Sequence, residues 1–280
     1  MKDRSGIGNR INEHRHPAWM YRYPRSVALL WVWFEVLYQR TWIIRSRLHR
    51  LLKTAPESLR VLDAGCGEGL FLLPAARKFP RHRFEGVDLR RANVELCDRY
   101  RESVGIRNLW LRQANLTQLK TEPADLLLCV GVLHCIPDDT AALHRLAAAL
   151  APGGRLLLYS PLDRRRILPG FEYLFRSTLN YEAHHAQHIY TDQELTLKMN
   201  AAGLQVEQRR FTNGTLGIIG YELVTGAFLI ANRPNFLLKI LGYGLFLALV
   251  PVQVTLNLID LLIPKKNGNG CLYVLRHRER

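Results

Sequence analysis

The chain has 280 residues, enough for one large α/β domain with insertions. Its composition, 48% hydrophobic and 22% charged, is that of a folded protein and excludes a chain disordered over its whole length. The net charge of +15 favours a polyanionic partner, either nucleic acid or an anionic membrane face, although a merely basic soluble protein has the same balance.

The first residues and the cysteines indicate a reduced, cytosolic setting. Residues 1–25 are polar and basic and lack the apolar core of a signal peptide. The five cysteines have neither the spacing of a disulfide frame nor that of a zinc site, so no metal is expected. Residues 26–44 predict one helix, rich in aromatic side chains, that packs over the active site; interfacial membrane contact is the alternative.

The most informative stretch is a short apolar strand followed by a glycine turn and a helical pattern, at residues 60–79. From Asp63 the turn reads Asp-Ala-Gly-Cys-Gly-Glu-Gly, which lets the backbone approach a ligand closely. Such a turn opens a nucleotide-binding α/β domain. Leu70 is too bulky for a dinucleotide fingerprint and Asp63 would repel a pyrophosphate, whereas a cofactor with a cationic amino-acid end tolerates the acid.

The spacing acid-x-Gly-x-Gly-x-Gly resembles the first motif of class I S-adenosylmethionine-dependent methyltransferases of the small-molecule type. A second strand, at residues 83–89, ends in Asp88, where such folds place a carboxylate for the ribose hydroxyls. The alternative is an acid that caps the next helix. After the third strand the family usually has an acid for the adenine amino group; here Asn115 stands there, and its carbonyl can accept the same bond.

The remaining elements follow the same family order. A fourth strand at residues 124–131 leads to His134, and a helix, a Pro-Gly-Gly turn, a fifth strand, a helix capped by Thr191 and a sixth strand follow. Residues 271–275 predict a final antiparallel strand beside the sixth. The resemblance therefore implies a doubly wound, mostly parallel seven-stranded sheet, Rossmann-like, with a hydrophobic helical insertion between the sixth and seventh strands.

The resemblance also assigns candidate site residues. Those expected to bind S-adenosylmethionine are Asp63, Ala64, Gly65, Cys66, Gly67, Asp88, Leu89, Asn115, Leu116 and Val130. A histidine near its usual pKa can accept a proton at neutral pH, so His134 and then His188 are the candidate catalytic bases, with His184 and His185 nearby. The alternative is that these histidines only line or cap the pocket.

The insertion, residues 214–263, is the most apolar part of the chain. Residues 240–259 carry no charge and are long enough to cross a bilayer core of ~30 Å, although Gln253 and Asn257 suit lipid poorly. Because the last strand must rejoin the sheet, a single crossing is excluded. We expect peripheral docking on the cytoplasmic face of a membrane, helped by the basic N-terminal region and by Arg209, Arg210, Lys265 and Lys266. The alternative is a buried cap over the pocket.

The sequence thus predicts four parts. They are a basic and aromatic helical lid (1–52), a methyltransferase core (53–213), the hydrophobic insertion (214–263) and the final strand (264–280). The expected function is methyl transfer from S-adenosylmethionine to a lipophilic small molecule or lipid-linked intermediate. The alternatives are an RNA or DNA methyltransferase, although residues 130–133 lack the Asn-Pro-Pro-Tyr type of motif, and a non-catalytic membrane adaptor of the same fold.

Overall fold

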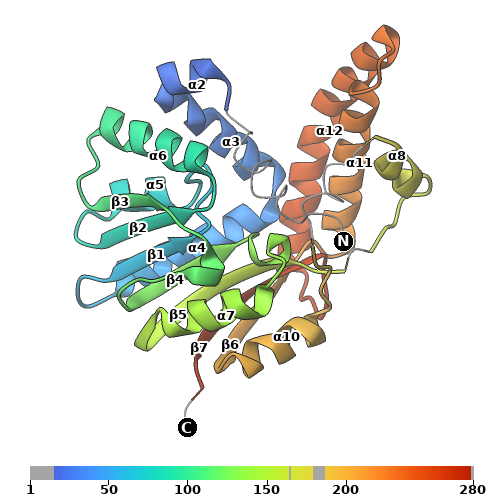
Figure 1. The fold of residues 1–280 in the computed structure, drawn as a ribbon. Coiled ribbons are helices and arrows are strands. Elements are labelled where there is room, and N and C mark those ends of the chain that lie inside the picture. Colours follow the sequence, from blue (N-terminus) through green and yellow to red (C-terminus); the bar gives the residue numbers. More distant parts are fainter. Residues whose placement is uncertain (1–15, 164, 179–186, 279–280) are drawn as a thin grey trace, which may run out of the picture.

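The computed structural model describes residues 16–163, 165–178 and 187–278. They form one seven-stranded sheet with helices on both faces and a two-helix hairpin that projects beyond one edge (Figure 1). The strands are β1 Arg60–Ala64, β2 Arg83–Asp88, β3 Leu109–Gln113, β4 Ala124–Val130, β5 Leu150–Pro161, β6 Leu204–Thr212 and β7 Gly270–His277. Their order across the sheet is β3-β2-β1-β4-β5-β7-β6.

The sheet is mixed, and its one antiparallel strand is β7. Strands β1 to β5 pair in parallel, whereas β7 runs antiparallel to both β5 and β6. This confirms the predicted fold and the predicted place of the last strand. Thr212 at the end of β6 pairs with Gly270 at the start of β7. The chain between these two strands therefore leaves the sheet and returns to it at the same place.

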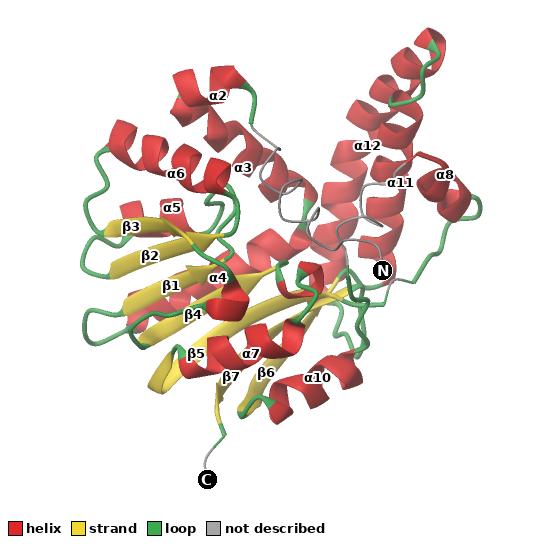
Figure 2. Cartoon of the chain, in the orientation of Figure 1, coloured by secondary structure: helices red, strands yellow, loops and turns green. Residues whose placement is uncertain are grey.

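Helices cover the two faces of the sheet (Figure 2). They are α2 Ala18–Arg22, α3 Val27–Leu37, α4 Gln39–Thr54, α5 Leu72–Lys78, α6 Arg91–Val104, α7 Asp139–Ala148, α8 Phe171–Thr178, α10 Asp192–Ala201, α11 Thr215–Ala231 and α12 Phe236–Leu262, with short turns η1 Pro24–Ser26, η2 Leu116–Gln118 and η3 Leu133–Cys135. Helices α3 to α6 share one hydrophobic cluster with the sheet, and α7 and α10 share the other.

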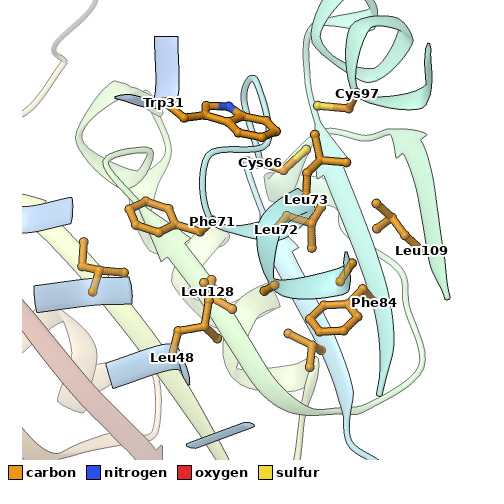
Figure 3. Packing of buried hydrophobic residues seen from close by; sticks show 14 of the residues in the cluster. Trp31, Leu48, Cys66, Phe71, Leu72, Leu73, Phe84, Cys97, Leu109 and Leu128 are labelled. Atoms are coloured by element: carbon orange, nitrogen blue, oxygen red, sulfur yellow. The ribbon is translucent and has the colours of Figure 1, made fainter. Parts of the chain in front are cut away.

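Strand β4 shows why the central strands read as continuous apolar runs. Leu126 and Leu128 belong to the cluster under α3 to α6, whereas Leu127 and Cys129 belong to the cluster under α7 and α10. Successive side chains of a strand point to opposite faces, so a strand buried on both faces needs an apolar residue at every position. In Figure 3 the first cluster extends from Leu128 in the sheet up to Trp31 of α3.

The single helix predicted over residues 26–44 is wrong. The chain instead forms η1, α3 and α4, and α3 and α4 are separated by Tyr38, whose backbone is extended (φ −116°, ψ 109°). The break frees the Leu37 carbonyl, which accepts hydrogen bonds from Gln253 Nε2 at 2.7 Å and Asn257 Nδ2 at 3.4 Å. Side chains more than 200 positions away along the chain therefore stabilise the break.

A buried polar cluster fixes the hairpin to the start of α4. Gln39 Nε2 donates to Asp260 Oδ2 at 2.9 Å, and Gln39 Oε1 accepts from the Asn213 amide at 2.9 Å. The Gly214 amide, at 3.0 Å, and Lys265 Nζ, at 3.1 Å, also contact Asp260 Oδ2. This cluster joins the α3–α4 break to both ends of the hairpin, so the hairpin stands at a fixed position on the sheet edge.

Helices α11 and α12 approach closely through glycines. A Cβ atom on Gly242 would overlap the backbone of Ala231, and a Cβ on Gly220 would lie 3.2 Å from the Cα of Gln253. Small residues at such contacts allow the tight helix packing that is common in membrane proteins.

We expect Gly242→Ala to destabilise the hairpin by about 1–3 kcal/mol, because the added methyl group forces two packed helices apart. Gly244→Ala is the matched control. It lies two residues away in the same helix with open space around it, so the helix propensity of alanine should make this change neutral or slightly stabilising. Thermal unfolding of both variants measures the difference, and equal melting temperatures would contradict this account of the packing.

Candidate active site

The glycine turn after β1 leaves open space where a ligand can lie. The turn is anchored by the Gly65 amide, which donates to the Val87 carbonyl at 2.8 Å. A Cβ on Gly65 would collide with Val132, whereas a Cβ on Gly67 would meet nothing within 4 Å. Both glycines have positive φ angles, +87° and +52°, which other residues rarely adopt. Gly65 is therefore required by packing, and Gly67 borders free space at the carboxyl edge of the sheet.

Asp88 supports this turn from the end of β2. Its Oδ2 accepts from the Gly67 amide at 2.9 Å, and its Oδ1 accepts from the Arg90 amide at 2.8 Å and from Asn93 Nδ2 at 3.0 Å. Asp88 thus joins the glycine turn to the start of α6, and its role as a ribose ligand stays a prediction. A carboxylate offers about four acceptor positions, so one remains for a ligand hydroxyl.

Asp63 lies at the end of β1 and is buried, with 2% of its surface exposed. Burial and then the charge of nearby Asp88 raise the pKa of Asp63 to about 7. Two carboxyl groups thus stand at the glycine turn, and a cation bound there would favour the ionised form of Asp63. The residues therefore fit a ligand that carries a positive charge at one end and hydroxyl groups further along.

Asn115, the predicted contact of the adenine amino group, also has a local structural role. Asn115 Oδ1 accepts from the Thr117 amide and the Thr117 hydroxyl, both at 3.0 Å, and so begins η2. Leu116 is buried beneath it, whereas Leu89, at the end of β2, is 44% exposed. The Asn115 residue is exposed, but an adenine amino group would have to share its side-chain oxygen with Thr117.

The two candidate bases lie on segments that touch each other. The His134 carbonyl, in η3, accepts from the amides of Gln187 at 2.8 Å and His188 at 3.1 Å. His188 Nε2 lies 3.0 Å from the Ile136 carbonyl, and its ring stacks on Tyr190 at 5.5 Å between centroids. The His188 imidazole thus has a structural role that the sequence did not indicate. His184 and His185 lie outside the described residues.

Sequence reasoning also missed two contacts around the site. Trp31 Nε1 donates to the Glu68 carbonyl at 3.1 Å, so α3 covers the glycine turn from above (Figure 3). Asp139 accepts from the Tyr190 hydroxyl at 2.6 Å and from Lys198 Nζ at 2.9 Å, which joins α7, α10 and the segment of His188. Both contacts join residues far apart in sequence, and only the aromatic richness of residues 26–44 pointed to the first.

Two surface hollows, with volumes of about 310 and 690 Å³, lie at the opposite edge of the sheet, around Pro152 to Arg155. None of the predicted cofactor or catalytic residues lines either of them. Among the described residues there is also no group of three or more His, Cys, Asp or Glu side chains that could hold a metal ion. The glycine turn therefore remains the candidate site.

Comparison with known proteins agrees with this geometry. A family model described as a methyltransferase domain matches residues 36–209, more than half of the chain. A ubiquinone biosynthesis O-methyltransferase of Xanthomonas axonopodis pv. citri is 32% identical over 160 residues, which are 54% of this chain and 65% of that protein. A trans-aconitate 2-methyltransferase of Pseudomonas aeruginosa is 38% identical over 103 residues, 36% of each protein. The chain thus spans less than two thirds of these relatives.

A solved structure shares the fold. Coclaurine N-methyltransferase bound to N-methylheliamine and SAH has a TM-score of 0.57 and 13% identity, over 84% of this chain and 70% of that one. S-adenosylmethionine is the cofactor of such methyltransferases and of this chain. The family match ends at residue 209, so the hairpin of α11 and α12 lies outside it.

We expect S-adenosylmethionine to bind more tightly as the pH rises through about 7. Asp63, with its pKa raised to about 7, must lose its proton to face the cationic end of the cofactor, so binding releases a proton. Calorimetry in two buffers of different ionisation enthalpy measures this release, which Asp63→Asn should abolish. An affinity independent of pH between 6 and 8 would contradict the assignment.

The stability of the cofactor-free protein should have the opposite dependence. The folded-state pKa of Asp63 exceeds the usual value of 3.8, so the protonated carboxyl group increases the free energy of unfolding. This stabilisation is complete below pH ~4 and is lost as the pH rises through about 7. Asp63→Asn should flatten this part of the profile of unfolding free energy against pH.

Proposed function

This chain belongs to the methyltransferase domain family, and we propose that it methylates a lipophilic acceptor while docked peripherally on the cytoplasmic face of a membrane. The enzyme uses S-adenosylmethionine. The observation that supports the lipophilic acceptor is the reversed polarity of the hairpin beside the site.

Helix α12 has its polar residues inside and its apolar residues outside. Its buried residues are Gly242, Gln253, Asn257 and Asp260. Its large apolar side chains are between 53% and 83% exposed at Phe236, Leu237, Ile240, Leu241, Leu247 and Leu262. Of the described helices it alone has the length and apolarity to cross a membrane, and only 17% of its most apolar window is buried. A core helix of a soluble protein would be mostly buried, so this pattern favours contact with lipid.

Helix α11 also buries its acid, although apolar residues such as Ile218 and Leu229 are buried with it. Glu222, in the middle of this apolar helix, is 1% exposed, and its carboxylate accepts from the amides of Ile167 at 3.1 Å and Leu168 at 2.7 Å. Glu222 therefore holds the segment before α8 against the hairpin and removes the one acid from the lipid-facing side. A cap and a docking surface are compatible roles for the hairpin, since Glu222 and the polar residues of α12 are buried while the large apolar side chains of α12 are exposed.

The apolar surface continues onto α3. Leu29 and Val32 are 63% and 54% exposed, and the ring of Trp33, 45% exposed, lies 5.8 Å from that of Phe246 in α12. Two segments from opposite ends of the chain thus form one apolar surface above the carboxyl edge of the sheet. Ligands of open α/β folds bind at that edge, so a lipid-soluble acceptor would be close to the cofactor.

Two of the four basic residues that flank the hairpin are engaged within the protein, whereas Arg210 and Lys266 are exposed. Lys265 is paired with buried Asp260, and Arg209 pairs with Asp192 at 2.8 Å, so neither is free to contact anionic lipid. Of the N-terminal arginines, Arg4, Arg10 and Arg15 fall within residues 1–15, which the structure does not describe, and Arg25 donates to the Ser103 carbonyl. Apolar contact would therefore supply most of the binding energy.

The chemistry needed from the protein is positioning. When bound, the cofactor supplies a methyl group on a sulfonium, which needs a nucleophile in line and water excluded. We propose that Asp63 and Asp88 hold the cofactor at the glycine turn and that His134, immediately after β4, takes the proton of the acceptor.

Methyl transfer to lipid tests the function. Incubation with S-adenosylmethionine labelled in the methyl group and with a cell lipid extract should yield labelled lipid. His134→Ala should lower the rate by about 10²-fold or more at unchanged cofactor affinity. A normal rate in His134→Ala would remove that residue as the base, and an absence of label in the lipid fraction would contradict the lipophilic acceptor.

Docking is tested with vesicles of phosphatidylcholine and phosphatidylglycerol. The protein should float with them and should be released only slightly by salt. Leu237→Glu with Leu241→Glu adds charge at exposed positions, so the fold should remain while flotation falls by at least about tenfold. Leu197→Glu, at a 62% exposed leucine of α10, is the control and should float like the unchanged protein. A wholly soluble protein that ignores vesicles would show that the hairpin does not dock.

A further inference from the structure

Arg40 forms no ion pair with an acidic side chain among the described residues. It lies half-buried in the first turn of α4, with its guanidinium carbon 4.7 Å from the centre of the Tyr38 ring and 5.7 Å from that of Tyr159. Within the part of the chain that the structure describes, the guanidinium has no hydrogen bond and no ion pair. Aromatic faces attract the charge, but they offer no oxygen or nitrogen acceptor to its five N–H donors, which remain open to water or to a ligand.

The position of Arg40 is next to the predicted cofactor site. Tyr159 pairs with Val130 across β4 and β5, and its carbonyl accepts from the Gly131 amide at 2.9 Å. Register partners on neighbouring parallel strands are about 4.8 Å apart and point to the same face. The guanidinium therefore lies by Tyr159 of β5, one strand away from Val130 and close to the carboxyl edge of the sheet.

The acids close by in sequence or structure are already engaged. Glu35, five positions before Arg40, pairs with Arg45. Asp260, which contacts the neighbouring residue Gln39, pairs with Lys265. The polar cluster around Gln39 also fixes the first turn of α4, so Arg40 is attached to a rigid base. A permanently charged group that is partly withdrawn from water, rigidly attached and unpaired is placed to receive an anion from outside the chain.

We infer that the acceptor carries an anionic group, a carboxylate or a phosphate, and that Arg40 binds it. This inference rests on the proposed function and narrows it to an acidic amphiphile. The apolar part lies against the surface formed by α12 and α3, and the planar guanidinium binds the acid through paired hydrogen bonds. Arg40 is thus a specificity-determining residue for the methyl transfer.

The experiment separates a cell lipid extract into acidic and neutral fractions by anion exchange and offers each with labelled S-adenosylmethionine. The label should appear in the acidic fraction. Arg40→Met should raise the apparent KM for that fraction by about tenfold or more and leave the affinity for the cofactor unchanged. Arg40→Lys keeps the charge but loses the paired geometry, so it should be intermediate. Arg145→Met, at an exposed arginine of α7, should behave like the unchanged protein.

The outcomes distinguish this inference from the proposed function. Label confined to neutral lipids, or an unchanged KM in Arg40→Met, would overturn the role of Arg40 and leave the lipophilic acceptor standing. No label in either fraction, with the cofactor still bound, would overturn both. Treating half of the acidic fraction with cold hydrofluoric acid, which cleaves phosphate esters, assigns the anion: loss of labelling supports a phosphate, and retention supports a carboxylate.

Discussion

The buried contact between Gln39 and Asp260 is the interaction on which the unusual part of this structure depends. Burial acts to raise the pKa of Asp260, but the hydrogen bonds from Gln39, Lys265 and the Gly214 amide outweigh it and hold the pKa below its ordinary value. The charged carboxylate therefore joins three segments: the start of α4, the end of β6 and the end of α12. Without it, a hairpin that leaves and re-enters the sheet at one edge could pivot on its two connections.

The same contact explains how an apolar hairpin can belong to a folded enzyme. The side chains of Gln253 and Asn257, on one face of α12, donate hydrogen bonds to the Leu37 carbonyl, where α3 ends. These polar groups therefore stabilise the protein instead of weakening the helix. Among the described residues, the large apolar side chains of the other face stay exposed, and the continuation of this face onto α3 makes it larger than the scattered leucines of an ordinary surface. A lipid surface can cover such a face without forming any hydrogen bonds to it. The exposed apolar face and buried polar residues of α12 therefore support docking more strongly than the apolarity of the sequence alone.

The local pattern of apolar residues predicted much of the sheet. The features that it did not predict depend on contacts between residues far apart in the sequence. The fourth strand, predicted over residues 124–131, is observed at Ala124–Val130. Thr191 caps α10 as predicted, since its hydroxyl accepts from the Glu194 amide at 3.1 Å. The break at Tyr38 was not foreseen, because the amides that satisfy it lie in α12. The pairing of Lys265 with Asp260 was missed for the same reason. The roles of Asp63, Asp88, Asn115 and the two histidines stay predictions.

The net charge of +15 needs a different interpretation from the one that the sequence suggested. Several of the arginines stand at the edge of the sheet opposite the hairpin, where Arg155 pairs with Glu207 at 2.8 Å and Arg276 lines a hollow with Arg278. The hairpin leaves the sheet at the other edge, so these cations do not flank the surface that we propose for docking. On our proposals, apolar contact selects a lipophilic acceptor at the membrane, and a single guanidinium, Arg40, selects its charge beside the cofactor. The two requirements then act on different parts of one molecule.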